Sequence, residues 1–362
     1  MPITFFTGSY SVKDVRFLLK PMKMQDTPVH VKEALIQSGT RHYSELLTHE
    51  ALPPPEYLHL FHQAMALNQQ RMAQDLLRLA KQIVATRTQG ITLVSLARAG
   101  TPIGVLLKHI LELYYTIEAP HYSISILRDV GLDENALRYL VQNHHPGSLV
   151  FVDGWTGKGV IARQLAESLR VFAADTGIFV PAELYVLTDL SGSATVAASA
   201  DDYLIPSCIL NATVSGLISR TVVDKNNLAA TDFHGCVYYQ GYEQQDLSRY
   251  FINTLLTTIN KLSTDPVKPY DNVLDRQARH AISEAFLKQI TQCYGVSHHN
   301  YIKPGIGEAT RVLLRRKARL LLLRDSDNDA TQHLRWLAQT KSIPIDVRSD
   351  LPYQAAALIQ EV

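Results

Sequence analysis

The feature that most constrains the fold is a series of short apolar runs that alternate with helical patterns from residue 90 onward. We expect strands at five runs rich in Val, Ile, Leu and Tyr: 91–96, 122–127, 149–152, 184–187 and 203–205. The first four begin roughly 30 residues apart, with helical patterns between them. Strands that are apolar on both faces and alternate with helices are typical of a parallel sheet covered on both sides. The sequence therefore predicts an α/β domain.

The segments on either side extend this domain and add a second one. Residues 1–88 are expected to form a mostly helical extension, with helical spacing clearest at 57–87 after three prolines. We expect a linker at 263–272, where two prolines and two aspartates occur without any periodicity. The sequence thus predicts a first domain at 1–267, with its core at 89–267, and a smaller α/β domain at 273–362. Within the smaller domain the expected elements are helix 307–317, strand 318–323, helix 330–340, strand 343–347 and helix 353–359.

Charge and cysteine content limit the classes of function. The net charge is +1, from 35 Lys and Arg against 34 Asp and Glu, so any nucleic-acid contact has to come from a local patch. Three widely spaced cysteines without a CxxC pair predict neither a disulfide framework nor a zinc ribbon. The first residues lack the pattern of a signal peptide, and the uncharged stretch at 203–219 contains a proline and three serines. We therefore expect a cytoplasmic protein without a membrane partner.

The segment 149–165 carries the most chemical information. Its expected strand ends at Asp153, and a loop at 154–159 with Thr156, Gly157, Lys158 and Gly159 then leads into a helix. Backbone N–H groups of such a loop attract anions, to which a threonine hydroxyl and a lysine charge add. A nucleotide-hydrolase P-loop does not fit, because Val152 and Gly159 occupy positions that require glycine and Ser or Thr. The alternative is a tight turn whose glycines serve only the backbone.

Two further strand ends carry charges. Arg98 follows the first strand, beside Ala99 and Gly100, and its planar guanidinium suits a pyrophosphate or a carboxylate. Arg128 and Asp129 follow the second strand. Because the carboxyl ends of parallel strands lie at one edge of a sheet, the three strand ends predict one site. The alternatives are a surface arginine at a helix start and a structural ion pair.

These residues resemble the type I phosphoribosyltransferases, in which a strand, an acid and a Thr-Gly loop hold the 5-phosphate of phosphoribosyl pyrophosphate. More specifically, the chain resembles phosphoribosyltransferase-like proteins of tellurium-resistance and stress operons, the StiP family, which also carries a cysteine protease label. The segments that carry this resemblance are 5–21, 95–104, 152–159 and 210–222, and it covers roughly residues 1–265. Where the usual enzymes have two adjacent acids, Asp153 is followed by Gly154, and the loop is shorter.

The resemblance implies a parallel-sheet phosphoribosyltransferase-like domain that uses Mg²⁺ and phosphoribosyl pyrophosphate to modify a base or base-like acceptor. It implies that Arg98 neutralises the departing pyrophosphate together with Mg²⁺, while Lys158 holds the 5-phosphate and Asp153 the ribose. The metal ligands are not predicted. The residues expected to bind substrate are Thr156, Gly157, Gly159, Ala99, Gly100, Arg128 and Asp129.

The sequence is also compatible with two other functions. His234 and Cys236 lie two positions apart, so in a strand they share a face and can act as base and thiol nucleophile of a cysteine hydrolase. A buried structural cysteine is the alternative there, and we expect Cys208 to lie in the core. The shortened acidic motif favours the other function, a non-catalytic regulator that senses phosphoribosyl pyrophosphate or a nucleotide and binds RNA.

A basic segment lies in the second domain. Residues 303–324 hold seven Lys and Arg against Glu308 alone, which is a local electrostatic footprint in a nearly neutral chain. The stretch 305–311 resembles the Gly-x-Asn-Glu-x-x-Lys/Arg loop of the Pelota-like RNA-binding family, with a glycine in place of the asparagine. The resemblance covers about 275–362 and implies recognition of a folded RNA. A solvated basic helix is the alternative, and a homo-oligomer is compatible with the sequence. The expected RNA-binding residues are Gly305, Gly307, Glu308, Arg311 and Arg315.

Overall fold

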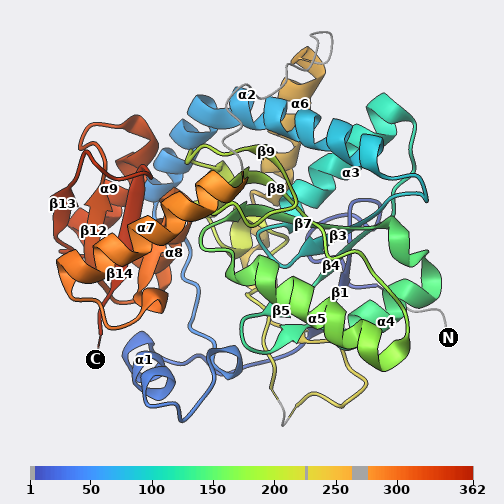
Figure 1. The fold of residues 1–362 in the computed structure, drawn as a ribbon, viewed down its shortest axis with the longest axis horizontal. Coiled ribbons are helices and arrows are strands. Elements are labelled where there is room, and N and C mark those ends of the chain that lie inside the picture. The colour runs from blue at the N-terminus through green and yellow to red at the C-terminus, as the bar shows by residue number, and fades with distance from the viewer. Residues whose placement is uncertain (1–4, 225–226, 263–275, 362) are drawn as a thin grey trace.

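Six parallel strands form the sheet of the larger domain in the computed structural model, which describes residues 5–224, 227–262 and 276–361 (Figure 1). In sheet order they are β1 (Arg16–Leu18), β4 (His121–Ile124), β3 (Thr92–Leu96), β7 (Leu149–Thr156), β8 (Leu184–Asp189) and β9 (Val196–Ser199). Every neighbouring pair in this sheet is parallel. The predicted parallel α/β fold is confirmed, whereas a phosphoribosyltransferase-like architecture stays a prediction. The predicted domain boundary lies outside the described residues.

Helices cover both faces of this sheet. One face carries α2 (Pro55–Thr86), α3 (Thr101–Tyr115) and α6 (Ser248–Leu262), and the other carries α4 (Glu134–Asn143) and α5 (Val160–Thr176) (Figure 1). Alternate residues of β7 point to opposite sides: Val150 and Val152 pack with α2 and α3, while Phe151 packs with α4 and α5. This two-sided burial explains why the strand reads as one continuous apolar run.

The first 88 residues are helical only in part. They contain α1 (Val29–Gln37), the short helix η1 (Tyr43–Glu45) and most prominently α2, but β1 forms an edge of the large sheet and β2 (Lys20–Pro21) pairs with β10 (Gly235–Cys236). A strand of two or three residues is too short to show a period, so the helical prediction was wrong there. The predicted strand at 203–205 is also wrong, because its apolar side chains pack beneath α2 as a loop and β9 takes the edge position.

The smaller domain is a four-stranded sheet between helices. The strand order is β11 (Ile302–Pro304), β14 (Ala355–Ile359), β12 (Ala318–Leu323) and β13 (Ile345–Val347), with antiparallel pairs except β12 and β13. Helices α8 (Ile306–Arg315) and α9 (Gln332–Thr340) cover one face and α7 (Arg276–Tyr294) the other. The helix predicted at 353–359 is the central strand β14. Its alanine-rich run is compatible with a helix or a strand. It forms a strand because it pairs with β11 on one side and with β12 on the other.

Short elements complete the chain. These are β5 (Ile126–Leu127), β6 (Gly131–Leu132), η2 (Pro146–Ser148), η3 (Pro206–Cys208), η4 (Ala212–Val214), η5 (Gln240–Gln245), η6 (His299–Tyr301) and η7 (Asp329–Thr331). Within the described part of the chain, no helix has the length and apolar character needed to cross a membrane.

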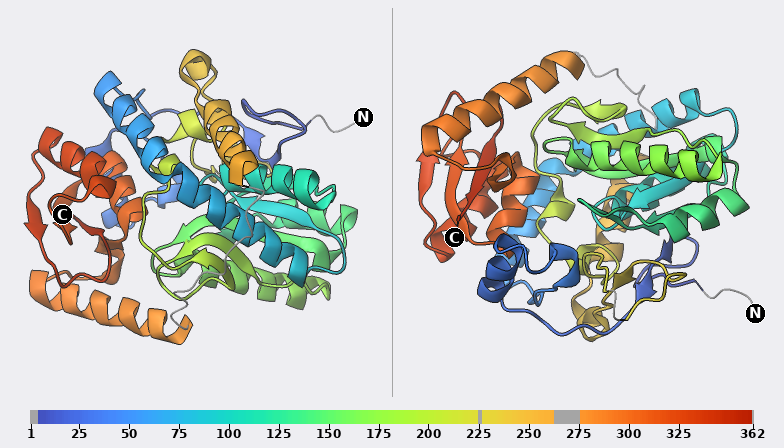
Figure 2. Two further views of the ribbon diagram at one scale, coloured as in Figure 1. Left: turned by 90° about the horizontal axis from the view of Figure 1, so that it is seen from above. Right: turned by 60° about the horizontal axis from the view of Figure 1, so that its bottom comes forward.

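The two domains lie side by side (Figure 2), and they contact each other at the start of α8. Asp202, in the loop after β9, accepts hydrogen bonds from the backbone N–H groups of Ile306 at 3.0 Å and Gln354 at 2.8 Å. On the other side, Arg316 forms an ion pair with Glu33 of α1. The smaller domain is thus anchored both to the sheet domain and to the first helix.

Candidate functional site

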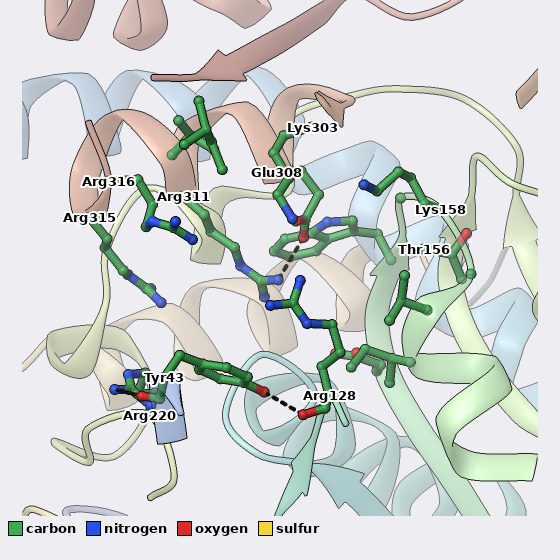
Figure 3. A pocket seen from close by; sticks show the side chains of 18 of the residues that line it. Tyr43, Arg128, Thr156, Lys158, Arg220, Lys303, Glu308, Arg311, Arg315 and Arg316 are labelled. Carbon is green, nitrogen blue, oxygen red and sulfur yellow. Dashed lines mark hydrogen bonds and ion pairs between the residues drawn. The ribbon is translucent and has the colours of Figure 1, made fainter. Parts of the chain in front are cut away.

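A cavity of about 320 Å³ lies where the two domains meet (Figure 3). Its walls come from the carboxyl end of β7, the loop that leads into α5, and helix α8. The loop predicted to hold phosphate and the loop predicted to hold RNA therefore lie in one place, facing each other. The charged lining residues are the cations Lys32, Arg128, Lys158, Arg220, Lys303, Arg311, Arg315 and Arg316 and the acids Asp153 and Glu308.

The acid and hydroxyl of the β7 segment are both present in this cavity. Strand β7 continues to Thr156 instead of ending at Val152, so Asp153 lies within the strand. Burial raises the pKa of Asp153 to about 6, against the opposing effect of Arg311. The Thr156 hydroxyl donates to the buried Asp189 carboxylate at 2.5 Å. That hydroxyl is already occupied, so its expected role as a free ligand donor is not what the structure shows.

The loop that follows brings the two domains into contact. Lys158 reaches across to donate to the carbonyl of His299, 2.5 Å away. Gly159, with φ of +70°, precedes α5. A Cβ on Gly157 would lie 2.9 Å from Cγ of Glu308. The lack of a side chain at Gly157 therefore lets the smaller domain approach.

The predicted RNA-binding loop faces the sheet domain. Gly305 has φ of +84°, and a Cβ there would lie 2.5 Å from Leu190. A Cβ on Gly307 would lie 2.4 Å from the indole ring of Trp155. In this arrangement the loop contacts protein where the resemblance implied a surface open to RNA. A sequence motif shows which residues share a loop but not which neighbour covers it.

Two arginines of α8 line the cavity from the other side. The Arg311 guanidinium lies 4.4 Å from the Trp155 ring centroid and forms a 2.8 Å ion pair with Glu308. Burial raises the pKa of Glu308, but Arg311, Lys303 and Lys158 outweigh it, so the pKa stays below its ordinary value. Arg315 donates a hydrogen bond to the Asn211 side chain. Its Nε is buried without a partner in the described structure.

Arg98 lies in an adjoining cavity of about 200 Å³ that shares Asp153, Trp155, Arg311 and Arg315 with the first. Its guanidinium binds both carboxylate oxygens of Glu50, at 2.7 and 2.9 Å, and the carbonyl of Ile218 at 2.7 Å. This buried pair neutralises the arginine that the sequence suggested as a pyrophosphate clamp. Arg98 therefore ties Glu50 to the carboxyl end of β3, in the middle of the sheet.

Of the remaining residues predicted at strand ends, some line the two cavities and others do not. Ala99 lines the adjoining cavity, whereas Gly100 has no room for a Cβ, which would lie 2.3 Å from the carbonyl of Val152. Arg128 lines the large cavity and lies 5.3 Å from the ring centroid of Tyr43. Asp129 is exposed, with φ of +65°, and pairs with Arg128 at 3.1 Å. Arg128 thus belongs to the candidate site, while Asp129 lies at its margin.

The cysteine pair suggested by the sequence is not assembled as a dyad. Cys236 has no exposed surface, and burial raises the pKa of its thiol to about 12. The His234 ring forms a 2.8 Å hydrogen bond with Ser125, and its backbone N–H donates to Asp133. Cys236 lies in a two-residue strand, too short for the shared-face argument to apply.

Cys208 lies in the core as expected, with 6% of its surface exposed, and it also lines the adjoining cavity, as do Arg98 and Arg311. Burial raises the pKa of its thiol to about 12, while Arg311 and a hydrogen bond with the Thr310 hydroxyl oppose this. The same hydroxyl lies 2.8 Å from Nε2 of His333, whose Nδ1 is buried and has no partner in the described structure. Local sequence gives no sign of this chain of groups, because its members come from η3, α8 and α9.

The described side chains do not fit a protein-held magnesium ion. Mg²⁺ prefers several oxygen ligands, commonly carboxylates. No cluster of three His, Cys, Asp or Glu suited to a metal occurs in residues 5–224, 227–262 and 276–361. In the large cavity the two acids stand among eight cations. The expected use of Mg²⁺ stays a prediction.

The structure thus defines a two-domain α/β protein with a cationic cavity and a buried thiol between the domains. Residues 8–256 match the family described as tellurite-like stress resistance cysteine protease StiP, and the chain belongs to this family. Residues 281–361 match the Pelota RNA binding domain. The protein named "Cysteine protease StiP" from Acinetobacter baylyi is 41% identical over 372 residues, which cover 99% of this chain and 95% of that relative. No solved structure matches the chain.

These comparisons correct the main functional expectation. The family and the relative are both named cysteine proteases, so the predicted phosphoribosyl transfer from phosphoribosyl pyrophosphate is wrong. They support the cysteine hydrolase that the sequence left as an alternative. The resemblances to the StiP family and to the Pelota-like family are confirmed. The cytoplasmic location and the homo-oligomer stay predictions.

Proposed function

We propose that the chain is a cysteine protease whose nucleophile is the thiol of Cys208. The observation that carries this assignment is the position of Cys208 on the wall of a cavity between the domains. Cys236 has no exposed surface, and Cys293 lies exposed on α7. The names of the family and of the relative from Acinetobacter baylyi support the reaction class.

The groups around Cys208 provide a path for its proton. In the resting structure the Thr310 hydroxyl donates its proton to the carbonyl of Ile306 at 2.7 Å, and Nε2 of His333 lies 2.8 Å from the same oxygen. As the sulfur adds to a substrate carbonyl carbon, the thiol proton passes to the Thr310 oxygen, and the original hydroxyl proton turns from the Ile306 carbonyl to Nε2 of His333. The protonated His333 then gives its proton to the leaving amine. Water hydrolyses the resulting thioester, which releases the acid product and restores the thiol. Burial lowers the pKa of His333 to about 3, so imidazole and thiol are both neutral at rest. Proton transfer therefore accompanies bond formation, since no thiolate is present beforehand.

Both domains contribute to this site. Cys208 belongs to η3 of the sheet domain, while Thr310 and His333 belong to α8 and α9 of the smaller one. Arg311, whose positive charge opposes the rise in the pKa of this thiol, also comes from α8. The smaller domain accordingly completes the catalytic groups.

The experiment compares three single substitutions in the full chain, assayed on casein and on a mixed peptide library with mass-spectrometric detection of cleavage. Cys208→Ala is expected to abolish cleavage. Cys236→Ala and Cys293→Ala are matched controls and are expected to retain it. Cleavage that survives Cys208→Ala and is lost in Cys236→Ala would reject Cys208 in favour of the buried cysteine. Wild-type protein without any cleavage would argue against the protease itself.

We further propose that the smaller domain binds RNA, which the match to the Pelota RNA binding domain supports. Because Arg311 is stacked inside the cavity and Lys317 is exposed, the two residues distinguish where RNA lies. In a mobility-shift assay with a structured RNA, Lys317→Gln is expected to weaken RNA binding. Arg311→Gln is expected to change RNA binding little. The reverse order would mean that RNA enters only when the domains separate. No shift with wild-type protein would contradict RNA binding.

A further inference from the structure

A third cavity, of about 340 Å³, adjoins the cavity that Cys208 lines. Its walls come from the loop at 47–54, the start of α2, the segment 209–213 and helices α8 and α9. Four residues line both cavities: Leu210, Asn211, Arg220 and Arg315. Leu210 is two positions from Cys208, a separation of at most about 7 Å along the chain. The third cavity therefore lies within one or two residues of a substrate bond held at the Cys208 sulfur.

The helices that carry Thr310 and His333 continue into this third cavity. On α9, Trp336 and Leu337 lie three and four positions after His333, and residues at this spacing share one face of a helix. On α8, Leu314 lies four positions after Thr310 and also lines the cavity. The helix faces that provide the proposed proton path thus provide a cavity wall one turn further on.

The lining of this cavity is mostly apolar, and we call it the apolar pocket. Its aliphatic surface comes from both domains and includes Leu47, Leu52, Pro53, Leu210, Leu314 and Leu337. The rings of Tyr57 from α2 and Trp336 from α9 lie 5.4 Å apart and form an aromatic part of the wall. Leu52 is 37% exposed, so this apolar surface reaches solvent. Apolar walls of this kind bind apolar groups.

The charged side chains of the lining are already bonded to the protein. The Lys32 ammonium donates to the Thr48 hydroxyl at 3.1 Å, and the Lys341 ammonium donates to a backbone carbonyl of α8 at 2.5 Å. Glu50 binds the Arg98 guanidinium. The two lining arginines also donate hydrogen bonds to protein oxygens. The pocket therefore offers a ligand apolar surface, in contrast to the cationic cavity lined by the loop at 154–159.

Tyr57 connects the apolar pocket with the thiol. Its ring is part of the pocket wall, and only 3% of its surface is exposed. Burial, followed by the effect of Cys208, raises the pKa of Tyr57 well above its ordinary value. One side chain is thus close both to the pocket and to the proposed nucleophile.

We propose that the apolar pocket binds a large apolar side chain of the substrate, such as leucine, methionine or phenylalanine, one or two residues from the bond that Cys208 attacks. This inference rests on the proposed protease function. Burial of such a side chain is expected to raise kcat/KM about 10- to 100-fold over alanine at the same substrate position. A charged substrate side chain is expected to be rejected, because the pocket has no free charge to pair with it.

The first experiment measures substrate preference. The full chain digests a mixed peptide library, and mass spectrometry of the products gives the residues around each cleaved bond. Leucine, methionine and phenylalanine are expected to be enriched at one fixed position. Two peptides that differ only by leucine or alanine at that position then give the ratio of their kcat/KM values, which is expected to be at least about tenfold.

Substitutions on the loop at 47–54 locate this preference. Ala51 lines the pocket and is exposed, so Ala51→Phe fills space without disturbing the core. The ratio for leucine over alanine is expected to fall below about threefold in this variant. Leu52→Asp, which places a charge at the same wall, is expected to lower the ratio as well and replaces Ala51→Phe should that variant fail to fold. Leu113→Asp is the matched control, because Leu113 is 60% exposed on α3 and is not part of the pocket.

A second experiment detects binding without catalysis. The chain has two tryptophans, so labelling with 5-fluorotryptophan gives two fluorine NMR signals, and Trp336→Phe assigns the one from the pocket. In full-length Cys208→Ala, N-acetyl-leucinamide at millimolar concentration is expected to shift the Trp336 signal and to leave the Trp155 signal in place. N-acetyl-alaninamide at the same concentration is expected to shift neither signal. Ala51→Phe is expected to abolish the shift.

The two experiments separate this inference from the protease itself. Cleavage without an apolar preference, or with one that Ala51→Phe and Leu52→Asp leave unchanged, would overturn the inference and leave Cys208 as the nucleophile. A preference for acidic residues would move the substrate side chain to the cationic cavity. A shift of the Trp336 signal without cleavage by wild-type protein would reject the protease but keep an apolar binding site. Absence of both cleavage and shift would reject both.

Discussion

Arg311 of α8 and Trp155 of β7 form the contact around which the two domains meet, with the guanidinium 4.4 Å from the indole ring centroid. The other side of the contact is Gly307, which leaves space for the ring. A cation over an indole is worth about 0.5 to 2 kcal/mol, depending on its desolvation. The pair therefore positions the arginine at the cavity and also contributes to docking of the smaller domain.

The first prediction concerns this close approach. Gly307→Ala places a methyl group 2.4 Å from the Trp155 ring, so the ring or α8 has to shift. Overpacking of this kind is expected to lower the free energy of unfolding by about 1 to 3 kcal/mol, measured by urea denaturation. Gly241→Ala is the control, because nothing lies within 4 Å of a Cβ there. Equal stability of the two variants would show that the domains are not docked as in the structure.

Much of the fold was predictable because the apolar pattern of a two-sided parallel sheet survives in the sequence. Val150, Phe151 and Val152 are buried against helices on opposite faces, and such a run has few alternatives. Elements shorter than four residues, such as β1, were missed since they have no period to detect. The alanine-rich strand β14 was missed because its state depends on its two neighbours.

The candidate site was predicted in pieces but not as a whole. Glycines and cations marked the Lys158 loop and the Arg311 helix separately, and the structure places them in one cavity. The sequence does not show which charged side chains are paired with another charge. Arg98, for example, is neutralised by Glu50, which lies in a loop 48 positions away in the chain. Cys208 was missed for a similar reason: Thr310 and His333 lie in a different domain.

Asp153 gives the second prediction, a pH dependence of stability. Its pKa is raised from 3.8 to about 6 in the folded chain, so the folded state holds a proton that the unfolded state has lost over this range. The contribution of Asp153 to unfolding free energy therefore falls as pH rises from about 4 to 6. Asp153→Asn is expected to flatten that fall, and to raise stability at pH 7 by about 1 to 2 kcal/mol.

The measurement is urea denaturation of wild type and Asp153→Asn at several pH values between about 4 and 8. Glu134→Gln is the control, because Glu134 is exposed at the start of α4 and pairs with Arg138. It is expected to leave the pH profile unchanged. A steeper fall in Asp153→Asn than in wild type would mean that Arg311 outweighs burial at this carboxylate.

The third prediction concerns thiol reactivity. Iodoacetamide reacts with exposed thiolates, so Cys293 is expected to be alkylated first in the native chain. Burial raises the pKa values of Cys208 and Cys236 to about 12, and both are expected to react only after denaturation or much more slowly. Mass spectrometry of tryptic peptides over time measures the order. Fast alkylation of Cys208 would show that the cavity opens readily and that its thiol ionises more easily than the closed geometry allows.

The fourth prediction separates a structural Arg98 from a ligand-binding one. The side chains of Arg98 and Glu50 are 7% and 9% exposed, and Arg98 outweighs the effect of burial to keep the pKa of Glu50 below its ordinary value. Glu50→Gln leaves a buried guanidinium without its counter-charge, and is expected to lower the free energy of unfolding by about 3 to 5 kcal/mol. Adding Arg98→Met to that variant is expected to restore part of this lost stability, because the uncompensated charge disappears.

Glu134→Gln, which breaks an exposed pair, is expected to change stability by less than about 1 kcal/mol. If Glu50→Gln were as mild as that surface substitution, Arg98 would not depend on Glu50 and its guanidinium would again be a candidate for binding a ligand.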